Sequence, residues 1–369
     1  MNKTPAANSR LPQWGLTWLI QVQCFYQHLC LVDSEVLRNP PLRQAANRCV
    51  KFFTTYQTMT FTNSAEFLSY LQTVWENEAS IIFDNEQEKW SEDFFQISKD
   101  RLKSIDPTKV SPGHKKNHYD ELINSYVAEL GVGLTQEQNE HLKNKISIGS
   151  VNTNDINAVC TTDKKGNYAV VVNSSLFTYL HKYGKLLTAL ANPSSVIYCN
   201  RKPAGELTKE DILEYIDILP KIYFEMDKVM GPMIHLDEQN TIVHMLILEM
   251  AEKFIIGHEL GHYFKGHLDN SSNTELFLSQ FEKLKNDNHA IEHEADDFSF
   301  ELLHKCKNNS NPEDFNQMMI NAGISLTFNG LNSLNPFASE THPAPIDRMN
   351  RLLPKTSHNI GIANSVAGH

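Results

Sequence analysis

The longest apolar stretch of the chain, from Ile242 to Ile256, constrains the fold more than any other feature. Its apolar side chains leave almost no polar face, which is typical of a helix that is buried on most sides. Four polar side chains interrupt the stretch, those of His244, Glu249, Glu252 and Lys253. No run therefore approaches the roughly 18 uncharged apolar residues that a membrane span needs. We expect a buried helix from about residue 238 to residue 268, and no membrane span.

The composition is that of a protein with a sizeable core and an acidic balance. The 369 residues are 41% hydrophobic, and their number suits one large domain or two ordinary ones. The net charge of −11 argues against nucleic acid or an anionic membrane as the main partner. Six scattered cysteines fit reduced thiols better than a disulfide framework. Residues 14–22 lack the cleavage site of a signal peptide, so we expect a cytoplasmic protein.

The first third of the chain has the pattern of a separate helical region. Apolar residues recur three and four apart in four segments, residues 14–31, 42–56, 65–75 and 90–102. Residues 105–116 then concentrate proline, glycine and charge, which predicts a domain boundary. We expect residues 1–110 to serve recognition or regulation and residues 111–369 to form a second domain.

The second domain begins with short segments that predict a small sheet among helices. Strands are expected at residues 146–148, 158–161 and 168–172, with a turn at 163–166. Helices are expected over residues 119–130 and 136–145, from Leu176, and from Thr208 onward to Met230 with a break at Pro220. The predicted fold class is therefore α+β and mainly helical, with a small β-sheet.

Residues 258–262 read His-Glu-Leu-Gly-His, a spacing that predicts a metal site on the long helix. Positions four apart lie one turn above each other, so His258 and His262 can direct two imidazole nitrogens at one Zn²⁺ ion. Glu259 is rotated by about 100° from His258, where it can take a proton from an attacking water molecule. In metzincins a third histidine lies six residues after the second, which is position 268 here, so His267 falls one place short of it. If His267 does not bind the metal, it is a solvent-facing histidine near the helix end.

A catalytic zinc site needs a third protein ligand, and candidates lie on another expected helix downstream. Glu292 and Asp296 are four residues apart there. One can bind the metal while the other accepts the second N–H of a zinc-binding histidine. We predict Glu292 as the ligand and Asp296 as the residue that holds the histidine. The alternatives are Glu294 or His293 as the ligand and Asp297 as the holding residue.

The arrangement His258-Glu-Leu-Gly-His262 with Glu292-x-x-Ala-Asp296 resembles the gluzincin metallopeptidases. In gluzincins a Glu on a following helix is the third zinc ligand, and an Asp four residues later supports the first histidine of the motif. The resemblance implies that the second domain is a zincin-like metallopeptidase domain and that Zn²⁺ is its cofactor.

Two further segments extend the resemblance, which covers roughly residues 145–355. Thr341-His-Pro343 with Arg348 and Leu352 is similar to the tail of the CAAX-protease-like zincins and of the family of the phage exclusion protein Lit. Residues 168–176 resemble the strand that precedes the active-site helix in Lit and in the ImmA/IrrE peptidases. By this resemblance His342 steadies the oxyanion of the reaction and Arg348 pairs with an active-site carboxylate. Without it, His342 can simply end a loop and Arg348 can face solvent.

The expected activity is that of a zinc metalloendopeptidase, with Glu259 as general base and a protein or peptide as substrate. A strand between residues 146 and 172 could hold an extended substrate at its edge, and residues 270–288 could form a rim or lid. The resemblance to Lit implies a defence factor or toxin-like effector that cuts one cytosolic protein, in its own cell or another. The resemblance to ImmA/IrrE implies a protease of a transcriptional regulator. No oligomeric state is indicated.

Three other classes are weighed against this interpretation. A zinc-bound regulatory module without catalysis needs a closed site with four ligands, which His267 or His293 would have to complete. A serine or cysteine hydrolase is disfavoured because no Gly-x-Ser-x-Gly motif occurs. A nucleotide-binding enzyme is disfavoured because the chain has no phosphate-binding glycine-rich motif.

Overall fold

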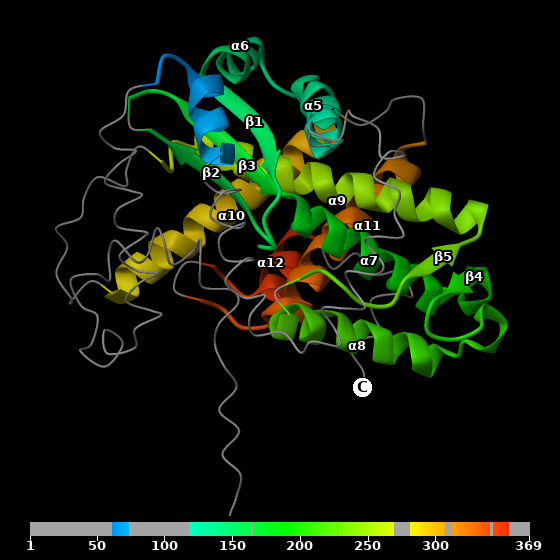
Figure 1. The fold of residues 1–369 in the computed structure, drawn as a ribbon. Coiled ribbons are helices and arrows are strands. Elements are labelled where there is room, and N and C mark those ends of the chain that lie inside the picture. Colours follow the sequence, from blue (N-terminus) through cyan, green and yellow to red (C-terminus); the bar gives the residue numbers. More distant parts are fainter. Residues whose placement is uncertain are drawn as a thin grey trace, which may run out of the picture.

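A computed structural model describes residues 61–73, 118–163, 165–226, 228–268, 281–306, 312–339 and 342–353. These residues form a mainly helical α+β fold with a three-stranded and a two-stranded sheet (Figure 1), so the predicted fold class is confirmed. The predicted helices at 14–31, 42–56 and 90–102 and the boundary segment 105–116 lie outside the described residues, as do residues 269–280. The division of the chain near residue 110 stays a prediction.

The three predicted strands are all present and pair in one sheet. They are β1 (Ile146–Val151), β2 (Ala158–Thr162) and β3 (Tyr168–Asn173), in the order β1-β3-β2. β1 runs parallel to β3, and β2 runs antiparallel to it. The turn between β2 and β3 is fixed by Asp163, whose Oδ1 accepts hydrogen bonds from the backbone N–H groups of Lys165 at 2.7 Å and Asn167 at 3.0 Å. Glycine is needed at 166 because its φ is +97°.

The central strand β3 is buried on both of its faces. Ala169 and Val171 pack with Phe61 and with Phe67 and Leu71 of a helix over residues 64–73. Val170 and Val172 point the other way, into the main core that includes α9. Because alternate residues of a strand point to opposite faces, the helix at 64–73 covers the face of the sheet that is turned away from α9.

Helices make up most of the rest of the fold. They are α5 (His118–Gly131), α6 (Gln136–Lys145), α7 (Ser174–Ala191), α8 (Lys209–Met226), α9 (Glu238–Phe264), α10 (Phe281–Lys305), α11 (Glu313–Leu334) and α12 (Pro345–Leu352), with short 3₁₀ helices at Pro193–Ser195 and Ala204–Glu206. A capping box of Thr135 and Gln138 begins α6. The second sheet pairs β4 (Val196–Cys199) with β5 (Ile234–Leu236), and neither strand is predicted from the sequence.

The predicted break at Pro220 is wrong. α8 runs from Lys209 to Met226 with Pro220 inside it, and it ends before the predicted Met230. A proline inside a helix removes one hydrogen bond and costs about 3 kcal/mol. Leu219 and Pro220 are both buried, so their packing offsets this cost.

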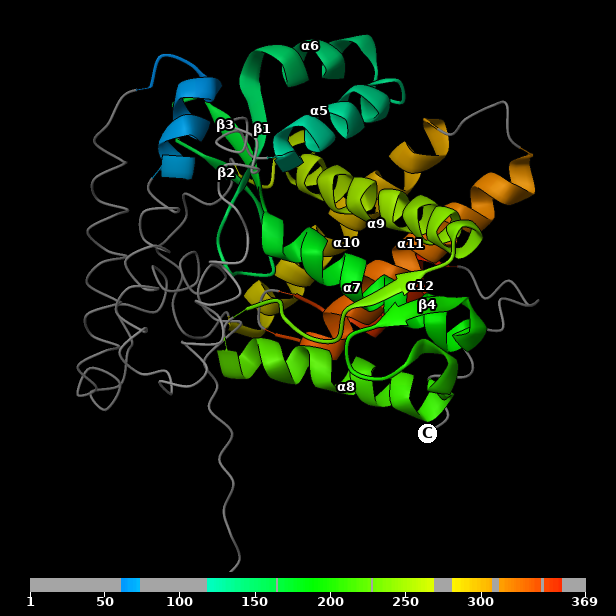
Figure 2. The same ribbon diagram turned by 45° about the vertical axis from the view of Figure 1, so that its right-hand side comes forward.

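Helix α9 is the central element, and Asp237 begins it by accepting a hydrogen bond from the backbone N–H of Asn240. It lies between α5 and the pair α7 and α11 (Figures 1 and 2). Its first half is less buried than predicted, since Ile242, Val243 and Met245 are exposed. Residues 251–261 are buried throughout.

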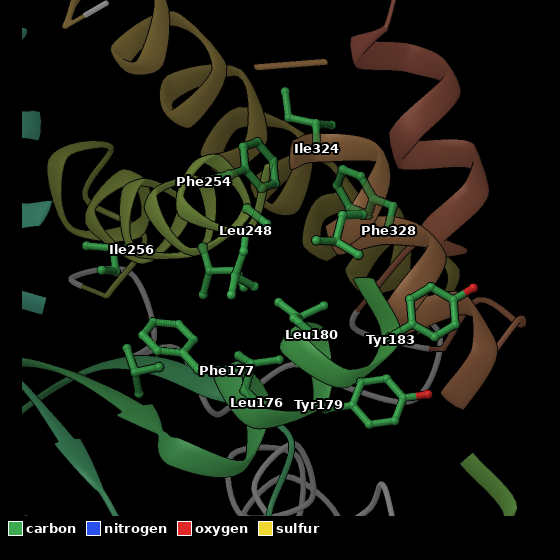
Figure 3. Packing of buried hydrophobic residues seen from close by; sticks show 14 of the residues in the cluster. Leu176, Phe177, Tyr179, Leu180, Tyr183, Leu248, Phe254, Ile256, Ile324 and Phe328 are labelled. Carbon is green, nitrogen blue, oxygen red and sulfur yellow. The ribbon is translucent and has the colours of Figure 1, made fainter. Parts of the chain in front are cut away.

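The core around α9 is built from apolar side chains of several helices. Phe254 packs edge-to-face on Phe328 of α11 at a ring distance of 5.5 Å, and Leu180 of α7 lies nearby (Figure 3). Among the described residues, no helix is both long enough and apolar enough to cross a bilayer. The last two turns of α9 also carry polar side chains into this core, those of His258 and Glu259.

Candidate metal centre

Two glycines bring α9 and α10 into close contact beneath the predicted site. A Cβ atom on Gly261 would lie 2.9 Å from the Cα and O atoms of Ala295. A Cβ atom on Gly257 would lie 2.5 Å from the hydroxyl of Ser299, which donates a 2.7 Å hydrogen bond to the Phe254 carbonyl. The helices can approach this closely only where α9 has no side chain, and the approach places the acidic residues of α10 above the histidines of α9.

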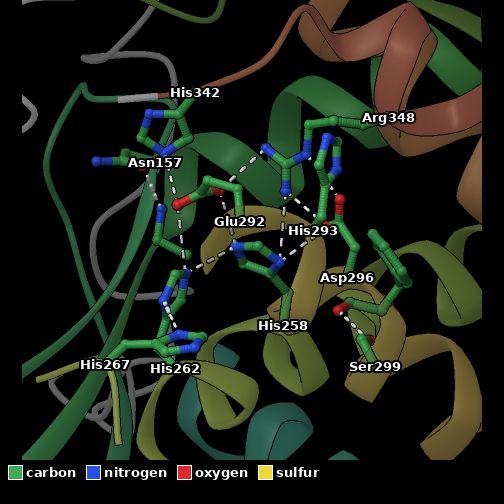
Figure 4. Close-up of polar contacts among 12 residues, drawn as sticks. Asn157, His258, His262, His267, Glu292, His293, Asp296, Ser299, His342 and Arg348 are labelled. Atoms are coloured by element: carbon green, nitrogen blue, oxygen red, sulfur yellow. Dashed lines mark hydrogen bonds and ion pairs between the residues drawn. The ribbon is translucent and has the colours of Figure 1, made fainter. Parts of the chain in front are cut away.

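Three predicted ligands converge where the two helices meet (Figure 4). The Nε2 atoms of His258 and His262 are 3.1 Å apart. The carboxylate of Glu292 lies 3.4 Å from the first nitrogen and 3.5 Å from the second. These are the only three His, Cys, Asp or Glu side chains that meet as a metal-binding group within the described part of the chain.

The three donors fit a metal ion by their spacing and by their chemistry. Ligand atoms about 2.0–2.1 Å from a tetrahedral zinc ion are about 3.3 Å from one another, close to the three distances found here. The Oε2 atom of Glu292 is buried and accepts no hydrogen bond from any described residue, and its nearest partners are Arg348 Nη1 at 3.2 Å and His258 Nε2 at 3.4 Å. An ionised carboxylate has lone pairs on both oxygens, so Glu292 can pair with Arg348 and still bind a metal ion. The residues could therefore hold a divalent metal.

Asp296 and Arg348 hold His258 from behind. Asp296 Oδ1 lies 3.0 Å from His258 Nδ1, on the side of the ring opposite the converging donors. The guanidinium of Arg348 donates two hydrogen bonds to Asp296, at 2.9 and 2.6 Å. Despite burial, Arg348 holds the pKa of Asp296 down to about 2. The ionised Asp296 can accept the Nδ1 proton of His258 across this contact, which would leave Nε2 for a metal ion.

The charges around Glu292 keep it ionised. Burial opposes ionisation, but the side chains of His342 and Arg348 hold the pKa of Glu292 well below its usual range. His342 Nε2 is 3.4 Å and Arg348 Nη1 is 3.2 Å from the Glu292 carboxylate. The structure thus brings His342 and Arg348 to the predicted site from the far end of the chain.

Glu259 is buried beside the cluster, on the side of strand β2. Burial raises the pKa of Glu259 to about 7, and a backbone hydrogen bond from Cys160 of β2 opposes that rise. A carboxyl group with a pKa near neutrality can both accept and return a proton at physiological pH. This is the property that a general base needs.

The segment that carries His342 is fixed to α10. His289 Nε2 lies 2.9 Å from the Ser339 carbonyl, and Ser339 exchanges two hydrogen bonds with the backbone of His342. The side chain of His342 is 37% exposed, so it borders both the cluster and solvent. Thr341 of the predicted motif lies outside the described residues.

The alternative ligands occupy other positions. His267 lies behind His262 and contacts Glu294, whose side chain is mostly exposed. Asp297 pairs with Arg351 at 2.8 Å on the surface. Neither Glu294 nor His293 belongs to the converging group. Helical spacing does not predict the contact between His267 and His262, because the turn that creates it follows the end of the helix.

Comparison with known proteins adds one finding. Residues 219–363 match the sequence profile of the family Peptidase U49. The match begins within α8 and includes every side chain of the cluster, from His258 to Arg348. It supports a peptidase, and therefore a hydrolase that acts on proteins. Comparisons with curated proteins and with solved structures found no match.

Proposed function

We propose that this chain is a zinc-dependent endopeptidase that cleaves a specific protein substrate. The observation that carries the proposal is the convergence of His258, His262 and Glu292 beside the buried Glu259. The match to a peptidase family over the same residues supports it. A zinc ion held by these three side chains would activate water and polarise the carbonyl of the scissile peptide.

The residues of the chain have separate roles in this proposal. Glu259 accepts the proton of the attacking water and returns it to the nitrogen of the leaving amine. His342, at the exposed rim, donates a hydrogen bond to the oxygen on which negative charge develops. Asp296 and Arg348 hold His258 and Glu292 in place and do not touch the substrate.

Strand β2 offers a place for the substrate. It is an edge strand of the described sheet, since it pairs with β3 alone, and it contacts α9. Its residue Cys160 reaches Glu259 through the backbone. An extended peptide that pairs with the edge of β2 opposite β3 would run past the proposed general base.

Replacement of Glu259 by glutamine separates catalysis from metal binding. We expect Glu259→Gln to bind zinc within about threefold of the wild type, measured by competition with a chromophoric chelator, because Glu259 is not one of the three donors. New protein termini should appear in cells that express the wild type and be absent with Glu259→Gln. Wild-type and variant cells with the same termini would exclude proteolysis, and would favour a zinc-bound module without catalysis.

The same measurement addresses the biological role. A single cleaved cytosolic protein would support the role of a defence factor or toxin-like effector. A cleaved transcriptional regulator would support the alternative role. The cytosol as the place of action belongs to this proposal as well.

A further inference from the structure

We propose that His267 and Glu294 form a relay that holds His262 in the tautomer able to bind the metal. The relay rests on the proposed metal site and adds two positioning residues to it. The sequence predicts neither role: its spacing indicates His267 as a direct ligand or a solvent-facing histidine, and Glu294 as an alternative ligand.

The relay is a chain of two polar contacts that begins on the side of His262 away from the metal donors. His262 Nδ1 lies 3.1 Å from His267 Nδ1. The other nitrogen of His267, Nε2, lies 3.2 Å from the carboxylate of Glu294 on α10. The side chain of His267 is only 8% exposed, whereas that of Glu294 is 59% exposed. His267 faces the candidate ligand His262 in Figure 4. It is therefore enclosed between that ligand and a carboxylate that reaches solvent.

The backbone at the end of α9 fixes the position of His267. The N–H of His267 donates to the carbonyl of His262 at 3.0 Å, and the N–H of Gly266 donates to Tyr263 at 3.0 Å. Gly266 has a φ of +71°. These two bonds and the left-handed glycine define a Schellman motif, which turns the chain back over the last turn of the helix. The turn places the imidazole of His267 against that of His262.

Donor and acceptor roles then have one consistent assignment. A metal ligand at His262 Nε2 leaves the proton of that ring on Nδ1, which must donate. His267 Nδ1 must accept it, so His267 carries its own proton on Nε2. That proton is donated to Glu294, whose carboxylate only accepts. Glu294 therefore selects the tautomer of His267, and His267 selects the tautomer of His262.

The other candidate histidine ligand, His258, is held by α10 through a single direct contact. His258 Nδ1 meets Asp296 of α10 directly, whereas His262 reaches Glu294 of α10 through His267. The Nδ1 atom of each candidate histidine ligand is thus held by a carboxylate of α10, directly or through His267. The two carboxylates, those of Glu294 and Asp296, are two residues apart in the sequence. Partners of this kind orient metal ligands, and their loss typically costs 10- to 100-fold in metal affinity.

Reversal of the relay is the direct test. In Glu294→Lys the ammonium donates to His267 Nε2, which moves the His267 proton to Nδ1 and forces His262 to carry its proton on Nε2. We expect zinc affinity, measured by chelator competition, to fall about 10- to 100-fold. Glu294→Gln keeps an acceptor oxygen and should stay within about threefold. Glu301→Lys makes the same charge change at an exposed position of α10 and should also stay within about threefold.

Substitutions of His267 test the relay without a change of formal charge. His267→Asn places a carboxamide oxygen where Nδ1 stood, so it should keep zinc affinity within about fivefold of the wild type. His267→Leu removes the acceptor and should lose about 10- to 100-fold. If both variants keep the zinc affinity of the wild type, the relay is overturned. If both lose a large part of it, His267 is a ligand instead. Nitrogen-15 NMR of labelled histidines should show the His262 proton on Nδ1 in the wild type.

The outcomes separate this inference from the proposed function. A wild-type protein that binds no zinc contradicts the metal site itself. A wild type that binds zinc, together with a Glu294→Lys variant of equal affinity, contradicts the relay alone. The melting temperature of each variant in a chelator is first compared with that of the wild type, so that a loss of fold is recognised before zinc affinities are compared. Where Glu294→Lys fails to fold, the pair His267→Asn and His267→Leu decides the question.

Discussion

The polar side chains on the buried half of α9 fall into two sets with different tasks. His258, Glu259 and His262 form one wall of the candidate metal centre. Glu252 and Lys253 lie about two turns earlier and contact α5: Tyr126 donates a 2.8 Å hydrogen bond to Glu252, and Lys253 pairs with Glu129. Lys253 also pairs with Glu249, one turn earlier in α9. A buried polar group without such a contact would cost about 1–3 kcal/mol. Each polar residue that interrupts the apolar stretch here therefore has an identified contact.

Glu252 gives a prediction about pH. Burial raises the pKa of Glu252 from 4.5 to about 8. The folded state therefore keeps a proton that the unfolded state loses, so the free energy of unfolding falls as pH rises from about 4.5 to about 8. Glu252→Gln stays neutral and should be more stable than the wild type at pH 9, on the order of a few kcal/mol, with little difference at pH 4.5. Thermal melts at both pH values measure this. A difference that is the same at both would contradict it, and Glu301→Gln is the control.

Arg348 gives a prediction about stability. Its buried guanidinium lies against two buried carboxylates, those of Asp296 and Glu292. Loss of one member of a buried charge group leaves the others uncompensated, which costs about 3–5 kcal/mol. Arg348→Met should lower the free energy of unfolding in a chelator by that amount, measured with urea.

The neighbouring Arg351 provides the matched control for Arg348. It lies on the same helix and pairs with the exposed Asp297, so Arg351→Met should cost less than about 1 kcal/mol. Equal costs for the two variants would show that the buried charge group does not stabilise the fold.

The residues of the site differ in how far a sequence can indicate them. His258, Glu259 and His262 follow from helical spacing, which is local. Glu292 and Asp296 needed the same spacing on a second helix and the assumption that the two helices pack together. His342 and Arg348 rested on a resemblance, because tertiary packing alone brings them to the site. The contact of His267 with His262 depends on where α9 ends, and helical spacing cannot supply that.

At the scale of elements, the crossing of α9 and α10 decides whether the donors meet. The crossing depends on Gly257 and Gly261, which fit against Ser299 and Ala295. The strands of the first sheet were predicted because their β-branched residues and turn lie close together in the chain. β4 and β5 have four and three residues and are separated by α8, so no local pattern indicated their pairing. Pro220 shows the opposite failure, because burial overrode a local rule.

Gly261→Ala should open this crossing. The new methyl group would lie 2.9 Å from backbone atoms of Ala295, which cannot move without moving α10. Alanine favours a helix by about 1 kcal/mol over glycine, but such overpacking costs about 1–3 kcal/mol. We expect no gain or a net loss in the free energy of unfolding, together with weaker zinc binding, because Glu292 moves with α10.

A second glycine provides the comparison for Gly261→Ala. Gly205 has open space around its Cβ position, so Gly205→Ala should leave zinc affinity unchanged. Unchanged zinc affinity in Gly261→Ala would show that α10 adapts without moving the ligands. Urea unfolding and chelator competition together measure both effects.

At the scale of the whole molecule, the candidate centre joins elements that are far apart in the sequence. α9 supplies two candidate donors and the proposed general base, α10 supplies the third candidate donor, and the segment before α12 supplies His342. The helix at residues 64–73 packs on the opposite face of the sheet, where it supports β3 and does not contribute to the cluster. A metal ion at the centre would therefore connect α9 and α10 in the folded protein. The unfolded chain does not hold the three donors together and so does not form this site.

This linkage predicts that zinc stabilises the protein by mass action. A ligand that binds only the folded state adds about 2.7 kcal/mol at a concentration 100 times its Kd, which for a protein of this size raises Tm by roughly 5 °C or more. Glu292→Gln removes the charge of the third donor and should show a rise of less than about 2 °C at the same zinc concentration. Glu301→Gln makes the same substitution at an exposed position of α10 and should keep the full rise. Melts followed by circular dichroism, with a chelator and with added zinc, measure all three proteins. Equal rises in wild type and Glu292→Gln would place the bound zinc away from the cluster.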